Sequence, residues 1–144
     1  MNNLTFLQLE PIKLPLVAKL YKDHYPAGKP KRGETIIIVK AEHTLIGAVR
    51  FQPTRDAQLL TGMLIHPDFR GLGIGHQLLQ HCKQQISATN CYCFSFPHLT
   101  SFYQQHHFEE ISENQLPESL RDRFTRYVES GKQLHSLQFM IKNE

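Results

Sequence analysis

The sequence contains no apolar run that approaches the ~20 residues needed for a membrane-spanning helix. Its first residues also lack a basic stretch followed by an apolar core, so we expect no secretory signal there. Cysteines are few and odd in number, and Cys91 and Cys93 lie too close together for an easy disulfide. These absences predict a cytoplasmic protein with reduced thiols and no membrane partner.

The charge is modestly positive and unevenly distributed. The net charge is +3, and Lys29, Lys31 and Arg32 cluster in a segment rich in proline and glycine. Such a cluster can steer an anionic ligand toward the protein. Because the excess is small and no nucleic-acid-binding motif accompanies it, we expect no nucleic-acid partner.

Nine histidines and three cysteines suggest a metal site, but their spacing does not support one. His76 and His81 are five residues apart and miss the i, i+4 spacing of a helical zinc pair. Cys91 and Cys93 share a strand face, yet no second C-x-x-C or matching histidine pair follows them. We therefore predict no metal. The same cysteines with His98 could form a nucleophilic centre, although buried packing is the favoured role.

Hydrophobic periodicity predicts alternating strands and helices in a single domain, residues 1–144. We expect strands at 5–10, 34–40, 45–51, 58–65, 91–96, 108–111 and 134–141, and helices at 16–21, 72–86, 99–106 and 116–129. Gly47 is expected to mark a bulge. The helix at 72–86 predicts a parallel β-α-β crossover, whereas short turns make the earlier strands antiparallel. The predicted fold class is α/β (α+β): a mixed, mostly antiparallel central sheet of about six or seven strands with helices on both faces.

The most informative segment is residues 59–79, which read LLTGMLIHPDFRGLGIGHQLL. An apolar run leads into a turn, the cluster Arg70-Gly71-Leu72-Gly73-Ile74-Gly75 and a helical pattern. A helix N-terminus offers unpaired N–H groups, glycines let the backbone approach an anion, and Arg70 adds positive charge. The order fits a phosphate site, although these six residues alone fit a turn that merely starts a helix equally well.

The spacing excludes two common phosphate loops. In a G-x-G-x-x-G fingerprint the third glycine would fall at His76 or Leu78, and no Gly-Lys-Ser/Thr ending exists. Arg70-x-x-Gly73-x-Gly75 instead resembles the R/Q-x-x-G-x-G/A signature of the GNAT acyltransferases, which holds the pyrophosphate of acyl-coenzyme A. The preceding Ile65-His66-Pro67 is similar to the V-x-P that ends the family's fourth strand, and this favours the phosphate site.

A second segment, Ser101-Phe102-Tyr103-Gln104-Gln105-His106-His107-Phe108, resembles the family's F-Y-x-x-x-G-F segment. The resemblance covers residues 34–111 and implies a GNAT-like fold with acetyl-CoA as donor substrate. It implies that the strands at 58–65 and 91–96 splay apart to admit the pantetheine arm. The implied contacts are the backbone of Met63, Leu64 and Ile65 for the pantetheine and thioester, and Arg70, Gly71, Leu72, Gly73, Ile74, Gly75 and His76 for the pyrophosphate.

Tyr103 matches the family tyrosine that protonates the departing thiolate. The alternative is an ordinary aromatic residue that packs between Phe102 and Phe108. The match has departures: His107 replaces a glycine and tolerates positive φ better than most residues, and Phe96 replaces an asparagine. No acid lies within 58–65, where several members keep a general base. The base is therefore unassigned, and the candidates are a water chain or one of His24, Glu34 and His98.

These observations predict an N-acetyltransferase that moves an acetyl or other short acyl group from coenzyme A to an amine of a small molecule or protein. Direct attack is expected because no covalent nucleophile is evident. The acceptor is not readable, and its site is expected in the loop 22–33 and the segment 112–134. A homodimer is compatible with this prediction. The alternative is a non-catalytic acyl-CoA-binding sensor or partner-binding domain on the same scaffold.

Overall fold

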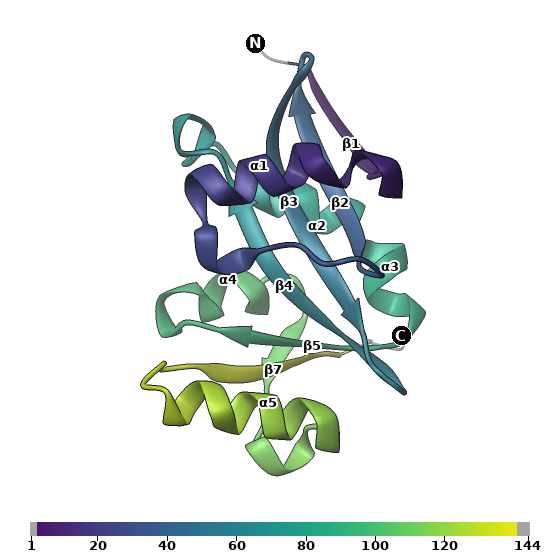
Figure 1. Ribbon diagram of the computed structural model, residues 1–144. Helices are drawn as coiled ribbons and strands as arrows, with labels where there is room; N and C mark the ends of the chain where they lie inside the picture. Colours follow the sequence, from purple (N-terminus) through teal and green to yellow (C-terminus); the bar gives the residue numbers. More distant parts are fainter. Residues whose placement is uncertain (1–2, 141–144) are drawn as a thin grey trace. The chain divides into compact units, whose positions relative to one another are not determined.

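The computed structural model describes residues 3–140 of the chain. These residues divide between two compact units, unit 1 (residues 1–52 and 61–83) and unit 2 (residues 53–60 and 84–144). Figure 1 shows the strands β1 (Leu4–Gln8), β2 (Thr35–Ala41), β3 (Thr44–Pro53), β4 (Ala57–Ile65), β5 (Asn90–Ser95), β6 (Phe108–Glu110) and β7 (His135–Phe139). The helices are α1 (Leu14–His24), α2 (Ile74–His81), α3 (Lys83–Ala88), α4 (Thr100–Gln104) and α5 (Glu118–Glu129), and short 3-10 helices include η3 (Pro67–Phe69) and η4 (Pro97–Leu99).

The strands form a seven-stranded sheet in the order β1-β2-β3-β4-β5-β7-β6, so that β4 contributes residues to both units. The predicted fold class is confirmed: the sheet is mixed and mostly antiparallel, as the pairs β1–β2, β2–β3, β5–β7 and β6–β7 show. The pair β4–β5 is parallel from Ala57↔Asn90 to Leu60↔Cys93, as the crossover predicted. Within residues 3–140, no helix has both the length and the hydropathy to cross a bilayer.

In unit 1, the predicted bulge at Gly47 is confirmed. Val39 of β2 pairs with Gly47 of β3, but the next residue, Lys40, pairs with Leu45, so β3 carries one extra residue. A Cβ on Gly47 would lie 2.8 Å from Cγ1 of Val39 and 2.9 Å from the carbonyl oxygen of Leu64. The close approach of neighbouring chain segments therefore requires glycine at this position.

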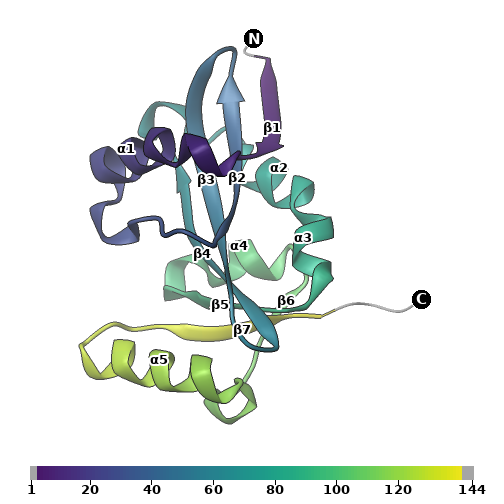
Figure 2. The same ribbon diagram turned by 45° about the vertical axis from the view of Figure 1, so that its right-hand side comes forward.

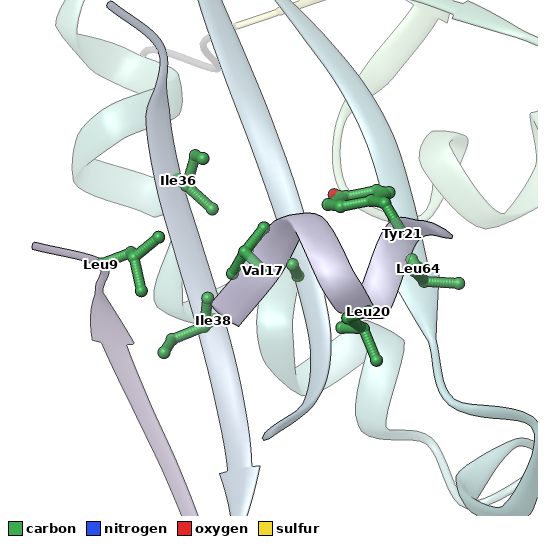
Figure 3. Packing of buried hydrophobic residues seen from close by; sticks show 8 residues of the cluster. Leu9, Val17, Leu20, Tyr21, Ile36, Ile38 and Leu64 are labelled. Carbon is green, nitrogen blue, oxygen red and sulfur yellow. The ribbon is translucent and has the colours of Figure 1, made fainter. Parts of the chain in front are cut away.

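The core of unit 1 lies between α1 and the strands. Figure 3 shows Val17, Leu20 and Tyr21 of α1 over Ile36 and Ile38 of β2. Since side chains alternate along a strand, Ile37 and Val39 face the opposite side of the sheet, and both are also buried. Figure 2 shows α2 on that opposite side. The helices of unit 1 thus cover both faces of its strands.

Unit 2 has its own core beneath α5. Leu120 and Phe124 of α5 pack with Leu59, Tyr92 and Ile111. The ring of Phe124 also meets the ring of Phe94 edge to face at 5.1 Å. The predicted helix at 116–129 is therefore confirmed, although α5 begins two residues later, after Pro117.

The predicted helix at 72–86 is wrong in two respects. It starts at Ile74, because Gly73 is left-handed, and Cys82 separates it into α2 and α3. The amide of Cys82 bonds to the carbonyl of Leu79, three residues back, which tightens the last turn of α2. Leu78, Cys82 and Ile86 are all buried, so the apolar spacing continues across the break and hides it in the sequence.

Other predicted elements are confirmed with shifted ends. The helix expected at 99–106 is α4, which is shorter and follows the 3-10 helix η4. The strand expected at 134–141 is β7, which ends at Phe139, and Ile141 lies outside the described residues.

Candidate functional site

The junction between β4 and α2, all within unit 1, is the predicted strand, glycine loop and helix. After Ile65 the chain enters η3, where Nδ1 of His66 accepts a hydrogen bond from the amide of Asp68 at 3.1 Å. Because this nitrogen accepts, the neutral tautomer with hydrogen on Nε2 is the one that fits. Arg70 and the glycine loop follow directly after this turn.

Two glycines set the backbone of this loop. Gly71 has φ +78° and Gly73 has φ +76°, and no atom lies within 4 Å of the Cβ that either could carry. The left-handed conformation, not crowding, therefore demands glycine at both positions. Gly75 lies in the first turn of α2, whose opening amide groups have no partner within the helix. This geometry exposes backbone N–H groups where an anion can approach.

Arg70 is tied to the end of β4. Its Nε donates to the carbonyl oxygen of Ile65 at 2.9 Å, and the side chain is exposed. The bond leaves the two terminal guanidinium nitrogens for other acceptors. A phosphate that meets the loop amides would therefore also find a charged donor whose position the strand fixes.

The last part of β4 carries the residues predicted to contact pantetheine. Leu64 is buried against α1, whereas Met63 and Ile65 are half-buried on the other side of the strand. Gly62, just before them, has φ +66° in the middle of the strand, and its carbonyl accepts the Tyr21 hydroxyl. This bend was not predicted, although an isolated glycine within a strand pattern is a signal for one.

Glu34 is removed as a general-base candidate. Its side chain is 3% exposed, and its carboxylate accepts hydrogen bonds from Arg50 at 2.8 Å and from Gln52. The amide of Lys31 donates to the same carboxylate at 2.7 Å. A carboxylate so enclosed and so fully bonded is not open to an incoming amine.

The two histidine candidates lie in different units. His24, at the end of α1 in unit 1, meets the ring of His66 edge to face at 4.4 Å. His98, in unit 2, is exposed and lies almost parallel to the ring of Phe96 at 6.1 Å. Of the two, only His24 therefore shares a unit with the glycine loop.

Tyr103 lies in α4, in unit 2, and is 5% exposed. Its ring contacts Phe102 and Phe108 edge to face, at 5.1 and 5.9 Å. Burial raises the pKa of the Cys93 thiol, and a hydrogen bond with Tyr103 opposes that shift. The aromatic packing that the sequence offered as an alternative role is thus present, and the hydroxyl has a sulfur partner.

His107 replaces the family's glycine in the expected way. Its φ is +70°, so the chain does turn through the left-handed region here. Its amide donates to Gln104 and its carbonyl accepts from the amide of Met140. The substitution therefore retains the turn that the resemblance requires.

The burial of the three cysteines argues against a nucleophilic centre. All three cysteines are buried and none is in a disulfide, and burial raises the pKa of Cys82 to about 12 and also raises the pKa of Cys93. A thiol whose pKa is raised in this way is protonated and unreactive near neutral pH. Among residues 3–140, no group of three or more histidine, cysteine or acidic side chains gathers where it could hold a metal ion.

A sequence model of the acetyltransferase (GNAT) domain matches residues 32–110, whereas no curated protein sequence matches the chain. The chain resembles N-acetylglutamate synthase of Neisseria gonorrhoeae, solved with coenzyme A and N-acetyl-glutamate, with a TM-score of 0.75 at 19% identity. The match covers 99% of this chain but 36% of that one. It thus spans about a third of that enzyme.

Two further structures match over nearly their whole length. The ribosomal-protein-S18-alanine N-acetyltransferase of Escherichia coli has a TM-score of 0.67 at 14% identity, with 99% of this chain and 97% of that one covered. Naa50 of Arabidopsis thaliana, in complex with the bisubstrate analogue CoA-Ac-MVNAL, has a TM-score of 0.68 at 14% identity, covering 96% and 99%. At these identities the likeness establishes the fold.

Proposed function

Because the chain belongs to the GNAT acetyltransferase family, we propose that it transfers an acetyl or other short acyl group from coenzyme A to an amine. The observation that carries the proposal is the junction of β4 and α2. There Gly71 and Gly73 are left-handed over open space, and Arg70 is anchored beside them. The non-catalytic sensor is not favoured, because the similar structures named above include a synthase, an N-acetyltransferase and a protein bound to a bisubstrate analogue.

In this proposal the donor binds along consecutive elements of unit 1. The pyrophosphate meets Arg70 and the loop amides of Gly71, Leu72, Gly73, Ile74, Gly75 and His76, where charge and backbone dipoles favour an anion. The pantetheine and the thioester carbonyl meet the backbone of Met63, Leu64 and Ile65. Acetyl-CoA is a substrate here, and the reaction as proposed uses no metal.

The chemistry needs a proton at sulfur and the loss of one from nitrogen. The amine lone pair attacks the thioester carbon, forming the C–N bond and placing the carbonyl electron pair on oxygen. When that pair returns, the C–S bond breaks and sulfur leaves as a thiolate. Tyr103 is proposed to give the thiolate a proton, and the amine proton passes to water or to a base such as His24.

The acceptor remains the open part of the proposal, so the test uses several amines. Glutamate, a peptide that begins with alanine and the peptide MVNAL follow from the similar proteins named above. Release of the coenzyme A thiol from acetyl-CoA is measured with each amine and without any. Acceleration by one of them supports the enzyme; binding of acetyl-CoA with no acceleration by any amine supports the sensor instead.

Donor binding is tested separately, by calorimetry with coenzyme A. Gly73→Val should abolish binding at micromolar concentrations, since valine at φ +76° is strained and the loop must change shape. Gly33→Val is the matched control, because Gly33 has φ +85°, equally open surroundings and a place in unit 1 outside the donor loop. Equal loss of binding in both variants would show that general destabilisation, not the loop, is responsible.

The role of Tyr103 is tested by Tyr103→Phe with an active acceptor. A proton donor to the thiolate should lower kcat on the order of 10²-fold with little change in acetyl-CoA affinity. Tyr92→Phe is the control, because Tyr92 is also 5% exposed and lies in the same unit. Equal kcat in the two variants would leave Tyr103 with packing alone.

The proposal extends to the organisation of the chain. The family match includes parts of both units, which supports a single domain over residues 1–144. Acetyl-CoA as donor and three cysteines that form no disulfide support a cytoplasmic location. A homodimer stays a prediction, and the molar mass in solution would test it.

A further inference from the structure

A bent peptide in β4 is held from behind by buried polar side chains of unit 1. Gly62 adopts φ +66° where the neighbouring residues continue as strand. Its carbonyl oxygen accepts a hydrogen bond from the Tyr21 hydroxyl at 2.5 Å. A planar trans peptide points its C=O and N–H in opposite directions, and the described residues contain no cis peptide. The bond to Tyr21 therefore aims the amide of Met63 away from Tyr21.

Arg50 closes the space over the same glycine. A Cβ on Gly62 would lie 2.6 Å from Nε and 3.1 Å from Nη2 of Arg50, and 3.1 Å from the Tyr21 hydroxyl. The guanidinium carbon also lies 5.2 Å from the centre of the Tyr21 ring. Both side chains thus pack directly on the backbone of Gly62, which leaves room for no other residue.

The guanidinium is itself fixed. Its Nη1 donates to both carboxylate oxygens of Glu34 at 2.8 Å and to the carbonyl of Lys29 at 3.1 Å. Arg50 is 4% exposed, and its Nε has no hydrogen-bond partner among the described residues. Burying an arginine with one unsatisfied donor lowers the stability of the fold. A buried ion pair is also often no more stabilising than apolar residues of similar size.

We propose that Tyr21 and Arg50 are positioning residues for acyl transfer: together they hold the Gly62 peptide so that the amide of Met63 faces the acyl thioester. This inference rests on the proposed function, in which the backbone of residues 63–65 receives that thioester. The amide then acts as a preorganised donor to the carbonyl oxygen, where negative charge grows as the amine attacks. Tyr21 and Arg50 need not touch the substrate.

The test compares two tyrosines that lie one helical turn apart. Tyr21→Phe removes the hydroxyl that holds Gly62 and retains the ring. Tyr25→Phe removes a hydroxyl near the same helix end, and its ring already packs 6.3 Å from that of Tyr21. Each protein is measured for binding of coenzyme A and of acetyl-CoA, and for the infrared carbonyl band of bound acetyl-CoA labelled with ¹³C.

In Tyr21→Phe we expect the preference for acetyl-CoA over coenzyme A to fall about fivefold, the factor that corresponds to one hydrogen bond of ~1 kcal/mol. The carbonyl band should move to higher wavenumber, because the bond is less polarised. Affinity for coenzyme A itself, which lacks the thioester carbonyl, should stay within about twofold of the wild type, because no hydrogen bond to this ligand is lost. Tyr25→Phe should match the wild type in all three measurements.

The outcomes separate this inference from the proposed function. Acetyl-CoA that fails to bind the wild type overturns both. Binding with an unchanged preference and carbonyl band in Tyr21→Phe overturns the positioning role alone. Loss of affinity for both ligands together would show that Tyr21 is merely structural, and it also overturns the role. If Tyr21→Phe does not fold, Arg50→Lys is measured instead: it retains a charge beside Glu34, removes the guanidinium from Gly62, and should produce the same carbonyl shift.

Discussion

The two units bury different kinds of polar side chain. Unit 1 encloses an ion pair, with the side chains of Arg50 and Glu34 only 5% and 3% exposed. The buried polar side chains described in unit 2 are neutral: Gln58, Ser95, Thr100 and Ser136. There Thr100 joins the hydroxyl of Ser95, at 2.8 Å, to Nδ1 of His135, at 2.9 Å.

The contrast separates two ways of fixing a backbone. In unit 2 the hydrogen bonds of Thr100 connect the start of α4 to the end of β5 and the start of β7, and the short hydroxyl side chains lose little conformational entropy. In unit 1 the long charged side chain of Arg50 is immobilised and desolvated, which costs free energy, and it packs on Gly62, a strand residue with positive φ. The side chain whose burial costs more free energy therefore lies beside the strand proposed to bind the donor.

The largest effect is expected from breaking the ion pair of unit 1. Glu34→Leu leaves Arg50 buried without its carboxylate, which should lower the free energy of unfolding by about 3–5 kcal/mol in urea titrations. The double variant Glu34→Leu/Arg50→Met should recover much of that loss, because no buried charge remains. A small loss in the single variant would mean that water reaches Arg50, and the contrast between the units would disappear.

A smaller effect is expected from the hydroxyl chain of unit 2. Thr100→Val retains the shape of the side chain but removes the hydrogen bonds to Ser95 and His135. We therefore expect the free energy of unfolding to fall by about 1–3 kcal/mol. Thr125→Val is the matched control, since Thr125 makes one exposed bond to Glu113 and should lose a few tenths of a kcal/mol at most. If Thr100→Val costs as much as Glu34→Leu, charge is not what distinguishes the units.

Alkaline pH should weaken both units through their thiols. Burial raises the pKa of Cys82 in unit 1 from 9.0 to about 12 and also raises that of Cys93 in unit 2. Above pH 9 the unfolded chain therefore loses protons that the folded chain retains, and stability falls by up to ~1.4 kcal/mol per pH unit for each thiol.

The alkaline effect can be assigned to each thiol by alkylation. Mass spectrometry after brief alkylation between pH 8 and about 10.5 reports which cysteine is exposed by opening. Equal rates for Cys82 and Cys93 would show that the units open together. Cys82→Ala should flatten the pH dependence of stability, and an unchanged slope would contradict the assignment to Cys82.

The smallest effect concerns one strained residue in each unit. His107 in unit 2 has φ +70° and Glu42 in unit 1 has φ +55°. His107→Gly relieves that strain and should raise stability by about 0.5–1 kcal/mol. Glu42→Gly should gain less, because its carboxylate accepts the amide of Asn3 at 3.1 Å. A larger gain at Glu42 in thermal unfolding would reverse the comparison.

Local chemistry made much of this molecule predictable. The glycine loop before α2, the bulge at Gly47 and the turn at His107 each follow from a residue type that permits a particular φ or a close approach. The parallel pairing of β4 and β5 follows from the helix between them. Each of these depends on a few neighbouring residues.

The features that were missed depend on residues far apart in the chain. Nothing near Glu34 shows that it will meet Arg50, and nothing near Gly62 shows that the hydroxyl of Tyr21, 41 residues back, will donate to its carbonyl oxygen. The break at Cys82 was missed for another reason: the buried residues Leu78, Cys82 and Ile86 keep the same four-residue spacing across it. Hydrophobic periodicity reports which side faces the core and is insensitive to one tightened turn.

The placement of β4 in both units has a consequence for the order in which the chain can fold on the ribosome. All residues of unit 1 precede Gln84, whereas the segment 53–60 of unit 2 is made before the β5 residues with which its residues 57–60 pair. Unit 2 cannot complete its pairing until β7 emerges. We therefore expect the glycine loop and the buried ion pair to be in place while β5, β6 and β7 are still being made.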